Sequence, residues 1–299
     1  MSFSKDIKEE LSKLNTFSNK ENVKFELIGY LISNNTTLIK EKIRYSTENE
    51  YNINRLNKLL NSLHVDYKIE LQGKVYIIIF RKVDLDKIKY LENKIQINME
   101  NKINIKSDEM LLKSLVRGSF LGGGSLNNPN NKYHLEILFS TLENANFILE
   151  VLKVAGIEVK ILKRKNSTSI YVKEAEEISN ILAFIGAGKS VLNFEEIRVM
   201  RDTRNNINRL VNCETANLNK TINASVEQIE QIEYLQKIGE FDNLPENLKE
   251  IAILRQENPD ASLVQLGAML CSPIGKSGVN HRLKKIIDIA EEIRKRGTI

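Results

Sequence analysis

The chain has 299 residues, 41% of them hydrophobic and 28% charged, with a formal net charge of +5. That balance is typical of a globular protein with a buried core, and the length allows two domains. No apolar run approaches the roughly 20 residues that span a bilayer. The acidic, weakly apolar N-terminus does not resemble a signal peptide, so we expect a cytoplasmic protein.

The first third of the chain predicts a short N-terminal helix followed by a mixed lobe. Residues 1–20 hold the first helix, over 2–14, and the spacing of apolar residues predicts further helices over 22–33 and 52–63. Alternating patterns predict strands within 36–47, 65–71 and 74–80, and Gln72-Gly73 is a hairpin turn signal. A short helix over 84–91 is expected to complete the lobe.

The second third repeats this order. A helix is predicted over 108–121 with Ser107 as its N-cap, and another over 142–155 closed by Gly156. Strands are predicted at 125–127, 133–140, 157–161 and 169–173, the last two joined by a turn at 165–167, with a final helix over 174–185. Each half is α-β-β-α-β-β-α, which predicts an α+β domain with antiparallel sheets over 21–190. Its lobes are expected at about 21–92 and 107–186.

The motif that the two halves share is an apolar helix that reaches a small residue, then a polar turn and a strand. It covers Leu27–Thr36 in the first half and Arg117–Ser125 in the second. Small residues let two helix backbones approach closely, so we expect these helices to meet at a pseudo-two-fold axis between the lobes.

A glycine-rich segment, Gly186-Ala187-Gly188-Lys189-Ser190, imitates the end of a phosphate-binding loop. The complete pattern needs a glycine where Ala183 stands and a preceding strand where a helix is expected. We therefore interpret Gly186 and Gly188 as the end of a helix.

Residues 191–243 are predicted to be a helical linker. Apolar residues at near-heptad spacing predict a helix over 193–216, and a second amphipathic helix is expected over 224–238. The polar segment that follows Ile238 has the composition of a linker.

Residues 244–299 have the pattern of a helix-turn-helix domain. Helices are predicted over 246–257, over 263–270 with Ser262 as its cap, and from a capping Ser277 to about 294. No acid lies between Ala261 and Ile287, so the third helix begins in a local basic window.

In a helix-turn-helix the first turns of the third helix meet base edges in the major groove. Asn280 can pair with adenine, Arg282 with guanine and the lysines with phosphate. The predicted DNA-binding residues are Ser262, Gln265, Lys276, Ser277, Gly278, Asn280, His281, Arg282, Lys284 and Lys285. The alternative is a solvated basic face on an ordinary helix.

Basic residues on one strand have two possible roles, and the cysteines and histidines predict no site. Lys40, Lys42 and Arg44 share one face of a strand, which is either a nucleic-acid surface or the solvated face of an antiparallel sheet. Cys213 and Cys271 are expected to be small buried side chains on helices. Two cysteines and three histidines at unrelated spacings predict no metal site and no cofactor.

Several segments resemble the WhiA family of bacterial regulators, over essentially the whole chain. They include Ser2–Leu11, Arg117–Ser125, Tyr133–Glu136, Arg201–Asn217, Asn258–Leu263 and Lys276–Leu283. The resemblance implies a degenerate LAGLIDADG homing-endonuclease-like domain joined to a C-terminal helix-turn-helix. It also implies a transcription factor of sporulation in filamentous actinobacteria, and of cell division and chromosome segregation elsewhere.

Active LAGLIDADG nucleases end each motif helix with an acid that holds a divalent metal. If Gly29 and Gly118 are equivalent, the acid positions hold Asn34 and Gly123, neither of which supplies an anionic oxygen. We therefore expect no catalytic residues, no metal and no enzyme. The rival hypothesis is a nuclease that uses other acids such as Glu26, Asp108 or Glu109.

The expected partner is double-stranded DNA, with a sigma factor or another transcription regulator as a candidate protein partner and no membrane. Because the pseudo-two-fold axis lies within one chain, we expect a monomer on an asymmetric DNA site, located at the nucleoid.

Overall fold

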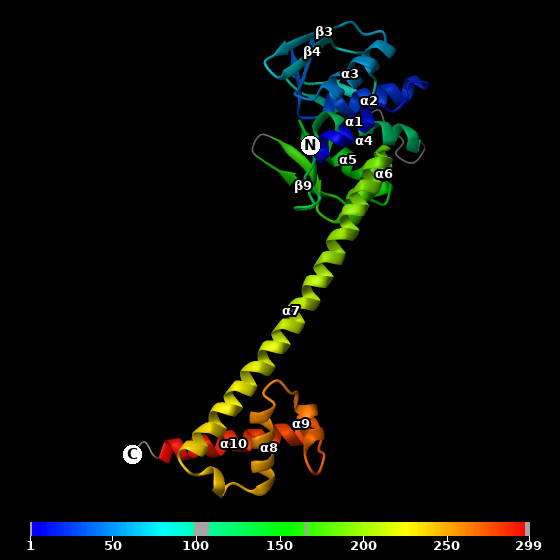
Figure 1. The fold of residues 1–299 in the computed structure, drawn as a ribbon. Coiled ribbons are helices and arrows are strands. Elements are labelled where there is room, and N and C mark those ends of the chain that lie inside the picture. The colour runs from blue at the N-terminus through cyan, green and yellow to red at the C-terminus, as the bar shows by residue number, and fades with distance from the viewer. Residues whose placement is uncertain (1, 99–107, 165–166, 297–299) are drawn as a thin grey trace. The chain divides into compact units, whose positions relative to one another are not determined.

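The computed structural model describes residues 2–98, 108–164 and 167–296, and the α+β class with antiparallel sheets is confirmed (Figure 1). The chain divides into two compact units, Met1–Thr203 and Arg204–Ile299. Each is described by itself. Within the described residues, no helix combines the length and apolarity needed to cross a membrane.

The first lobe follows α1 (Phe3–Ser12) and is built around α2 (Lys20–Ile32) and α3 (Glu50–Ser62). Its strands are β1 (Thr36–Ile39), β2 (Lys42–Thr47), β3 (Tyr67–Gln72) and β4 (Val75–Arg81), in the antiparallel order β1-β2-β4-β3. Asn19 and Asn49 cap the two helices through their side chains. Gly73 has φ of 63°, which only glycine adopts readily, so the predicted β3–β4 hairpin turn is confirmed.

A small hairpin stands where a helix was predicted over 84–91. Strand β5 (Ile88–Tyr90) pairs with β6 (Ile95–Ile97) in an antiparallel ribbon, so that prediction is wrong. The ribbon is held by Asn144 of the other lobe, which accepts from Ile97 N at 3.0 Å and donates to Ile95 O at 2.9 Å. The contacts with Asn144, which is distant in the sequence, thus favour strands where the local pattern of residues predicts a helix.

The second lobe repeats the first. It contains α4 (Glu109–Gly123), β7 (Gly124–Leu126), β8 (Leu135–Phe139), α5 (Leu142–Val154), β9 (Lys160–Lys163), β10 (Thr168–Val172) and α6 (Ala175–Ile185). The sheet order β7-β8-β10-β9 matches that of the first lobe, which confirms the duplication.

The caps of the second lobe follow from short polar residues and glycines. Asp108 caps α4 by accepting from Met110 N and Leu111 N; the predicted cap, Ser107, lies outside the described residues. Gly156 follows α5 with φ of 77°, as expected for a helix C-terminus. A turn was predicted at 165–167, and residues 165 and 166 lie outside the described residues.

The lobes meet where α2 crosses α4, at Gly29 and Gly118. A Cβ built on Gly29 would lie 2.3 Å from Leu115 O, and one on Gly118 would lie 2.0 Å from Glu26 O. Each glycine therefore faces the carbonyl three residues before the other. This reciprocity confirms that the two glycines are equivalent and that the motif helices form the interface.

A buried ion network lies beside this crossing. Glu26 accepts from Arg55 Nε at 2.6 Å and Nη2 at 2.8 Å, and from Arg117 Nη1 at 3.2 Å. The Glu26 and Arg55 side chains are 1% and 0% exposed. Arg55 also donates to Leu14 O, and Arg117 donates to Ile185 O at 2.8 Å. Glu26 thus links α2 to α3 and α4, and its two arginines extend the network to α6 and to the segment after α1.

A single helix, α7 (Gly188–Lys237), replaces the two helices predicted over 193–216 and 224–238. No glycine or proline interrupts residues 217–223, so polar composition alone suggested a break that does not exist. Gly186 ends α6 with φ of 93°, as predicted, whereas Gly188 begins α7 instead of ending a helix.

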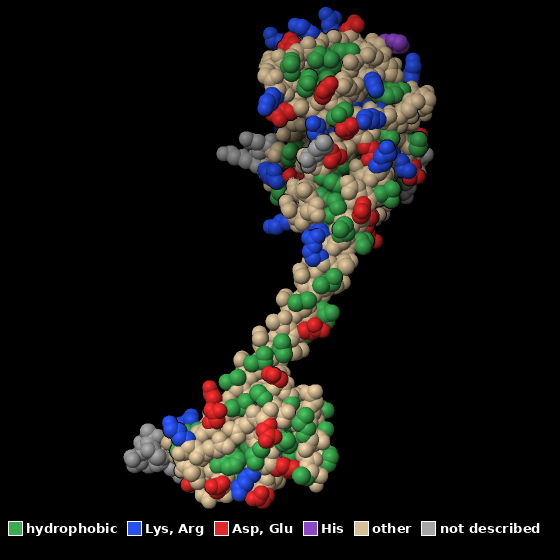
Figure 2. All heavy atoms as spheres, in the orientation of Figure 1, with side chains coloured by type: hydrophobic (Ala, Val, Ile, Leu, Met, Phe, Trp, Pro, Cys, Tyr) green, Lys and Arg blue, Asp and Glu red, His purple; other side chains and the backbone are tan. Residues whose placement is uncertain are grey.

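The central turns of α7 are exposed from residue 202 to 224, and the boundary between the two units falls among them. Their exposed apolar side chains include Ile207, Leu210, Val211, Leu218 and Ile222. Each of these five side chains is at least 45% exposed. Figure 2 shows hydrophobic side chains, in green, along this helix.

The C-terminal unit packs three helices against the end of α7. A 3₁₀ turn (Phe241–Asn243) leads into α8 (Glu246–Glu257), α9 (Leu263–Met269) and α10 (Lys276–Arg296). The core is made by apolar residues from all four helices, among them Ile232, Leu235, Leu248, Ile251, Leu266, Leu270, Val279, Leu283, Ile286 and Ala290.

Candidate nucleic-acid interface

The helices α9 and α10 form a tight helix-turn-helix because Gly267 has no side chain. A Cβ at Gly267 would lie 2.2 Å from Ile274 O and 3.0 Å from Val279 Cγ2. Ile274 N donates to Gly267 O at 3.1 Å, which holds the turn against α9. The small residue therefore fixes how closely the second helix approaches the third.

The N-terminus of α9 is closed by a reciprocal pair. Ser262 Oγ accepts from Gln265 N at 3.3 Å, and Gln265 Oε1 accepts from Ser262 N at 2.8 Å. This capping box satisfies backbone groups that would otherwise lack partners. Both predicted DNA-binding side chains therefore have a structural role, although both are exposed.

The third helix begins at Lys276, two residues earlier than a Ser277 cap predicts. Gly275 O accepts from Gly278 N at 2.9 Å and from Val279 N at 3.2 Å, so Ser277 lies inside the first turn and is not its cap. The prediction of a Ser277 cap is wrong because glycine can begin a helix without a capping side chain. Its hydroxyl is left exposed on the first turn.

The core residues Val279, Leu283 and Ile286 fix which side of α10 faces outward. At about 100° per residue, Ser277, His281, Lys284 and Lys285 lie on the opposite side. All four are exposed. The structure therefore brings these four predicted residues together on one outward face, here called the outer face of α10.

The remaining predicted residues flank that face. Gly278 packs on Ile274, and Lys276 and Asn280 turn toward α7. Arg282 lies on the other flank, where Nη1 donates to Asn247 O at 3.4 Å. Helical geometry places Asn280 and Arg282 about 160° apart, so the two do not share a face.

The turn between α9 and α10 is also tied to α8. Cys271 N donates to Glu250 Oε1 at 2.6 Å, and this bond holds the pKa of Glu250 below its usual range. The same carboxylate raises the pKa of the Cys271 thiol. Cys213 and Cys271 are both exposed, so the expectation that they would be buried is wrong.

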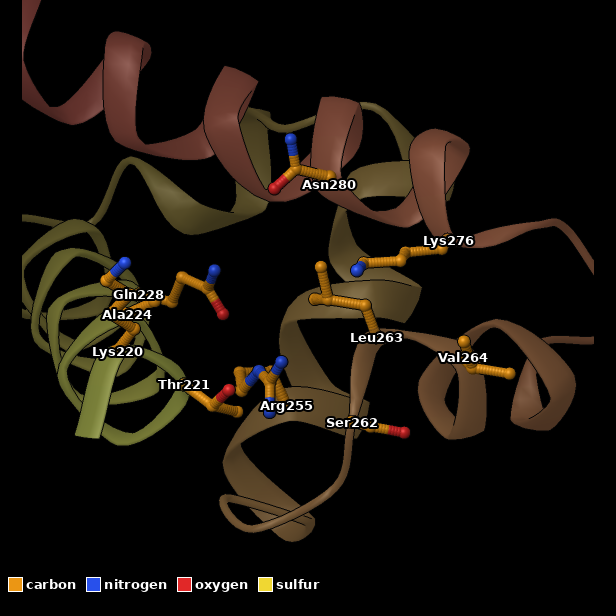
Figure 3. A pocket seen from close by; sticks show the side chains of 10 residues that line it. All are labelled: Lys220, Thr221, Ala224, Gln228, Arg255, Ser262, Leu263, Val264, Lys276 and Asn280. Atoms are coloured by element: carbon orange, nitrogen blue, oxygen red, sulfur yellow. The ribbon is translucent and has the colours of Figure 1, made fainter. Parts of the chain in front are cut away.

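A hollow of about 300 Å³ lies behind the outer face, between α7, α8, α9 and α10 (Figure 3). Its walls are Lys220, Thr221, Ala224 and Gln228 of α7, Arg255 of α8, Ser262, Leu263 and Val264 at the start of α9, and Lys276 and Asn280 of α10. Sequence reasoning missed the contributions of α7 and α8, because no local pattern marks residues that only the fold brings together.

In the N-terminal unit, the positions of the LAGLIDADG acids hold Asn34 and Gly123. Asn34 is exposed. Gly123 has no room for a side chain, because a Cβ there would lie 2.5 Å from Leu138 O and 3.3 Å from Ser33 Cβ. A carboxylate at this position would require the backbone to move.

The other acids considered for a nuclease have different partners. Glu26 is buried between two arginines, Asp108 caps α4, and Glu109 pairs with Lys113 at 2.8 Å on the surface. They are therefore occupied by separate structural contacts.

Of the three basic residues predicted to share one face of a strand, only two lie in a strand. Lys40 lies in the β1–β2 turn with φ of 55°, whereas Lys42 and Arg44 occupy β2 and pair with Arg81 and Ile79 of β4.

Comparisons with known proteins cover both units. The family model described as the WhiA LAGLIDADG-like domain matches residues 42–101 and 112–204, and the WhiA C-terminal HTH domain matches residues 207–290. A probable cell division protein WhiA of Clostridium tetani is 40% identical over 318 residues, with 99% of each chain covered. A relative of the same description from Staphylococcus haemolyticus is 40% identical over 311 residues, covering 98% of each.

A solved structure supports the same relationship. The crystal structure of full-length WhiA from Thermatoga maritima is 31% identical and superposes with a TM-score of 0.61, covering 98% of this chain and 99% of that one. Since the family models match most of the sequence and the relatives match end to end, the chain belongs to the WhiA family, with a LAGLIDADG-like domain and a C-terminal helix-turn-helix.

Proposed function

We propose that this protein is a sequence-specific DNA-binding transcription regulator of cell division and chromosome segregation, and of sporulation where that occurs. It acts in the cytoplasm at the nucleoid, as a monomer on an asymmetric site. The C-terminal unit reads DNA, and the LAGLIDADG-like domain is a non-catalytic scaffold. A sigma factor or another regulator is the proposed protein partner.

The outer face of α10 is the observation that carries this proposal. Ser277, His281, Lys284 and Lys285 are exposed together on the first turns of the third helix, in a window without acids. Donors and cations in this position suit base edges and phosphates. We assign base contacts to His281 on this face and to Asn280 on its flank. Phosphate contacts are assigned to Lys284 and Lys285 on the face and to Lys276 on the flank. Gly278, Ser262, Gln265 and Arg282 are proposed to position the helix.

The double variant Asn280→Ala/His281→Ala is expected to lose sequence preference. Each good base contact contributes about 1–3 kcal/mol of discrimination, so specific affinity should fall by about 100-fold while non-specific affinity changes little. The measurement is a mobility shift with duplexes that the unaltered full chain has selected from a randomised pool, compared with scrambled duplexes.

Lysine variants at two places on α10 separate this face from the general positive charge of the helix. Lys284→Ala/Lys285→Ala should weaken binding to every duplex and make the salt dependence of affinity shallower. Lys295→Ala, at the far end of the same helix, should leave both unchanged. Retained preference in the Asn280/His281 variant would overturn the base contacts assigned here.

The scaffold role of the N-terminal unit predicts that no strand is cut. Supercoiled plasmid incubated with the full chain and Mg²⁺ or Mn²⁺ should remain supercoiled, because Asn34 and Gly123 supply no carboxylate where a metal-activated water is needed. Agarose electrophoresis measures the result. Site-specific nicking that Glu109→Gln abolishes, or any site-specific nicking by the unaltered chain, would establish the rival nuclease instead.

A further inference from the structure

The hollow in the C-terminal unit contains a buried cation without a counter-charge. Arg255 is 2% exposed, and its Nη1 donates to Ala261 O at 2.7 Å and Pro259 O at 3.3 Å. Its Nε has no partner among the described residues. Burial lowers the pKa of this guanidinium below its usual range, without any contribution from a neighbouring carboxylate. A charge of this kind is costly to keep inside a protein unless something binds it.

A second polar group without a partner lies across the hollow. Gln228 of α7 is 7% exposed, and its Oε1 has no hydrogen-bond partner in the described structure. Figure 3 shows its amide reaching from α7 into the space that Arg255 lines. Rotation of the terminal amide would present two N–H donors to that space instead of an oxygen.

The remaining polar walls add positive charge. Lys220 and Lys276 line the hollow together with the Thr221 hydroxyl and the Asn280 amide. None of the ten wall residues is acidic. Three cations around one space repel one another, and an anion between them would offset that repulsion.

We propose that this hollow binds the phosphate group of a small anionic molecule. Arginine and lysine with amide and hydroxyl donors form the set that recognises phosphate oxygens. The volume of about 300 Å³ is at the lower end for a small-molecule site and exceeds what one phosphate needs. Ala224, Leu263 and Val264 form an apolar part of the wall, which suits the organic portion of a phosphate ester.

The site would communicate with DNA through two shared residues. Lys276 and Asn280 line the hollow and also belong to the first turns of α10, which are proposed to contact DNA. A bound phosphate would hold both side chains toward α7 and so compete with their DNA contacts. Only this consequence rests on the proposed function; anion binding itself does not.

Equilibrium dialysis of the full chain against radiolabelled inorganic phosphate, without DNA and with NaCl at constant ionic strength, tests the site. The expected result is saturable binding of one equivalent. Lys220→Ala/Lys276→Ala should weaken it by about tenfold or more, since both lysines are exposed and contribute charge-assisted bonds. Lys284→Ala/Lys285→Ala removes the same charge from the outer face and should change it less than about twofold.

Equal loss in both double variants would show that phosphate merely gathers on basic surfaces, and would overturn the proposal. Absence of saturable binding, combined with weaker DNA binding by Lys220→Ala, would assign the hollow to a backbone phosphate of DNA and also overturn it. Because the dialysis contains no DNA, failure of the proposed function in the mobility shift would leave its result unaffected.

Discussion

Gly118→Ala is expected to destabilise the N-terminal unit by about 3 kcal/mol or more, although alanine is the better helix former by about 1 kcal/mol. The added Cβ would lie 2.0 Å from Glu26 O and 2.9 Å from Glu26 C, both backbone atoms of α2. Neither can move without separating the two motif helices, which hold both lobes together.

Urea unfolding followed by near-UV circular dichroism measures this loss. Eight of the nine tyrosines precede Arg204 and the chain has no tryptophan, so the signal reports chiefly on the N-terminal unit. Gly188→Ala is the matched control, because nothing lies within 4 Å of a Cβ there. If the two variants have the same free energy of unfolding, the close contact between α2 and α4 does not determine the stability of the unit.

Glu26→Gln is expected to cost about 3–5 kcal/mol of the same unit's stability. The amide preserves shape but removes the charge that two buried arginines share, and its N–H groups would face their N–H groups. Such a loss is a large fraction of the about 5–15 kcal/mol that stabilises a typical domain.

The same unfolding measurement applies, with Glu109→Gln as its control. That carboxylate pairs with Lys113 at 2.8 Å but is 72% exposed, so solvent screens the pair and its loss should change little. A small effect of Glu26→Gln would mean that the carbonyls of Leu14 and Ile185 are enough to hold the arginines.

Local signals in the sequence predict most of the fold. Gly73 and Gly156 adopt the positive φ expected at a hairpin turn and a helix end, and the duplicated order of elements predicts two sheets of equal topology. The reciprocal fit of Gly29 and Gly118 also follows from matching the two copies. These features depend on single residues or on comparison within the chain.

Features that depend on distant contacts could not be predicted in this way. The β5–β6 ribbon is held by Asn144 from the other lobe, and continuity of α7 through polar residues has no local marker. In the interface, the window from Lys276 to Lys285 follows from charge, but the position of Lys276 and Asn280 beside α7 follows only from how α10 packs. Arg255 and Gln228 become part of a site only when α7 and α8 pack.

The packing around Gly123 also limits which substitutions this position can accept. One nucleotide change converts a glycine codon to an aspartate codon, so the acid would seem easy to regain. The substitution would place its Cβ 2.5 Å from Leu138 O, a backbone atom of strand β8 in the same lobe. Recovery of a metal-binding acid here would need the strand to shift first, and such an intermediate would lose stability before gaining any activity. A carboxylate at this position is therefore opposed by the packing of α4 against β8, whichever acid the codon supplies.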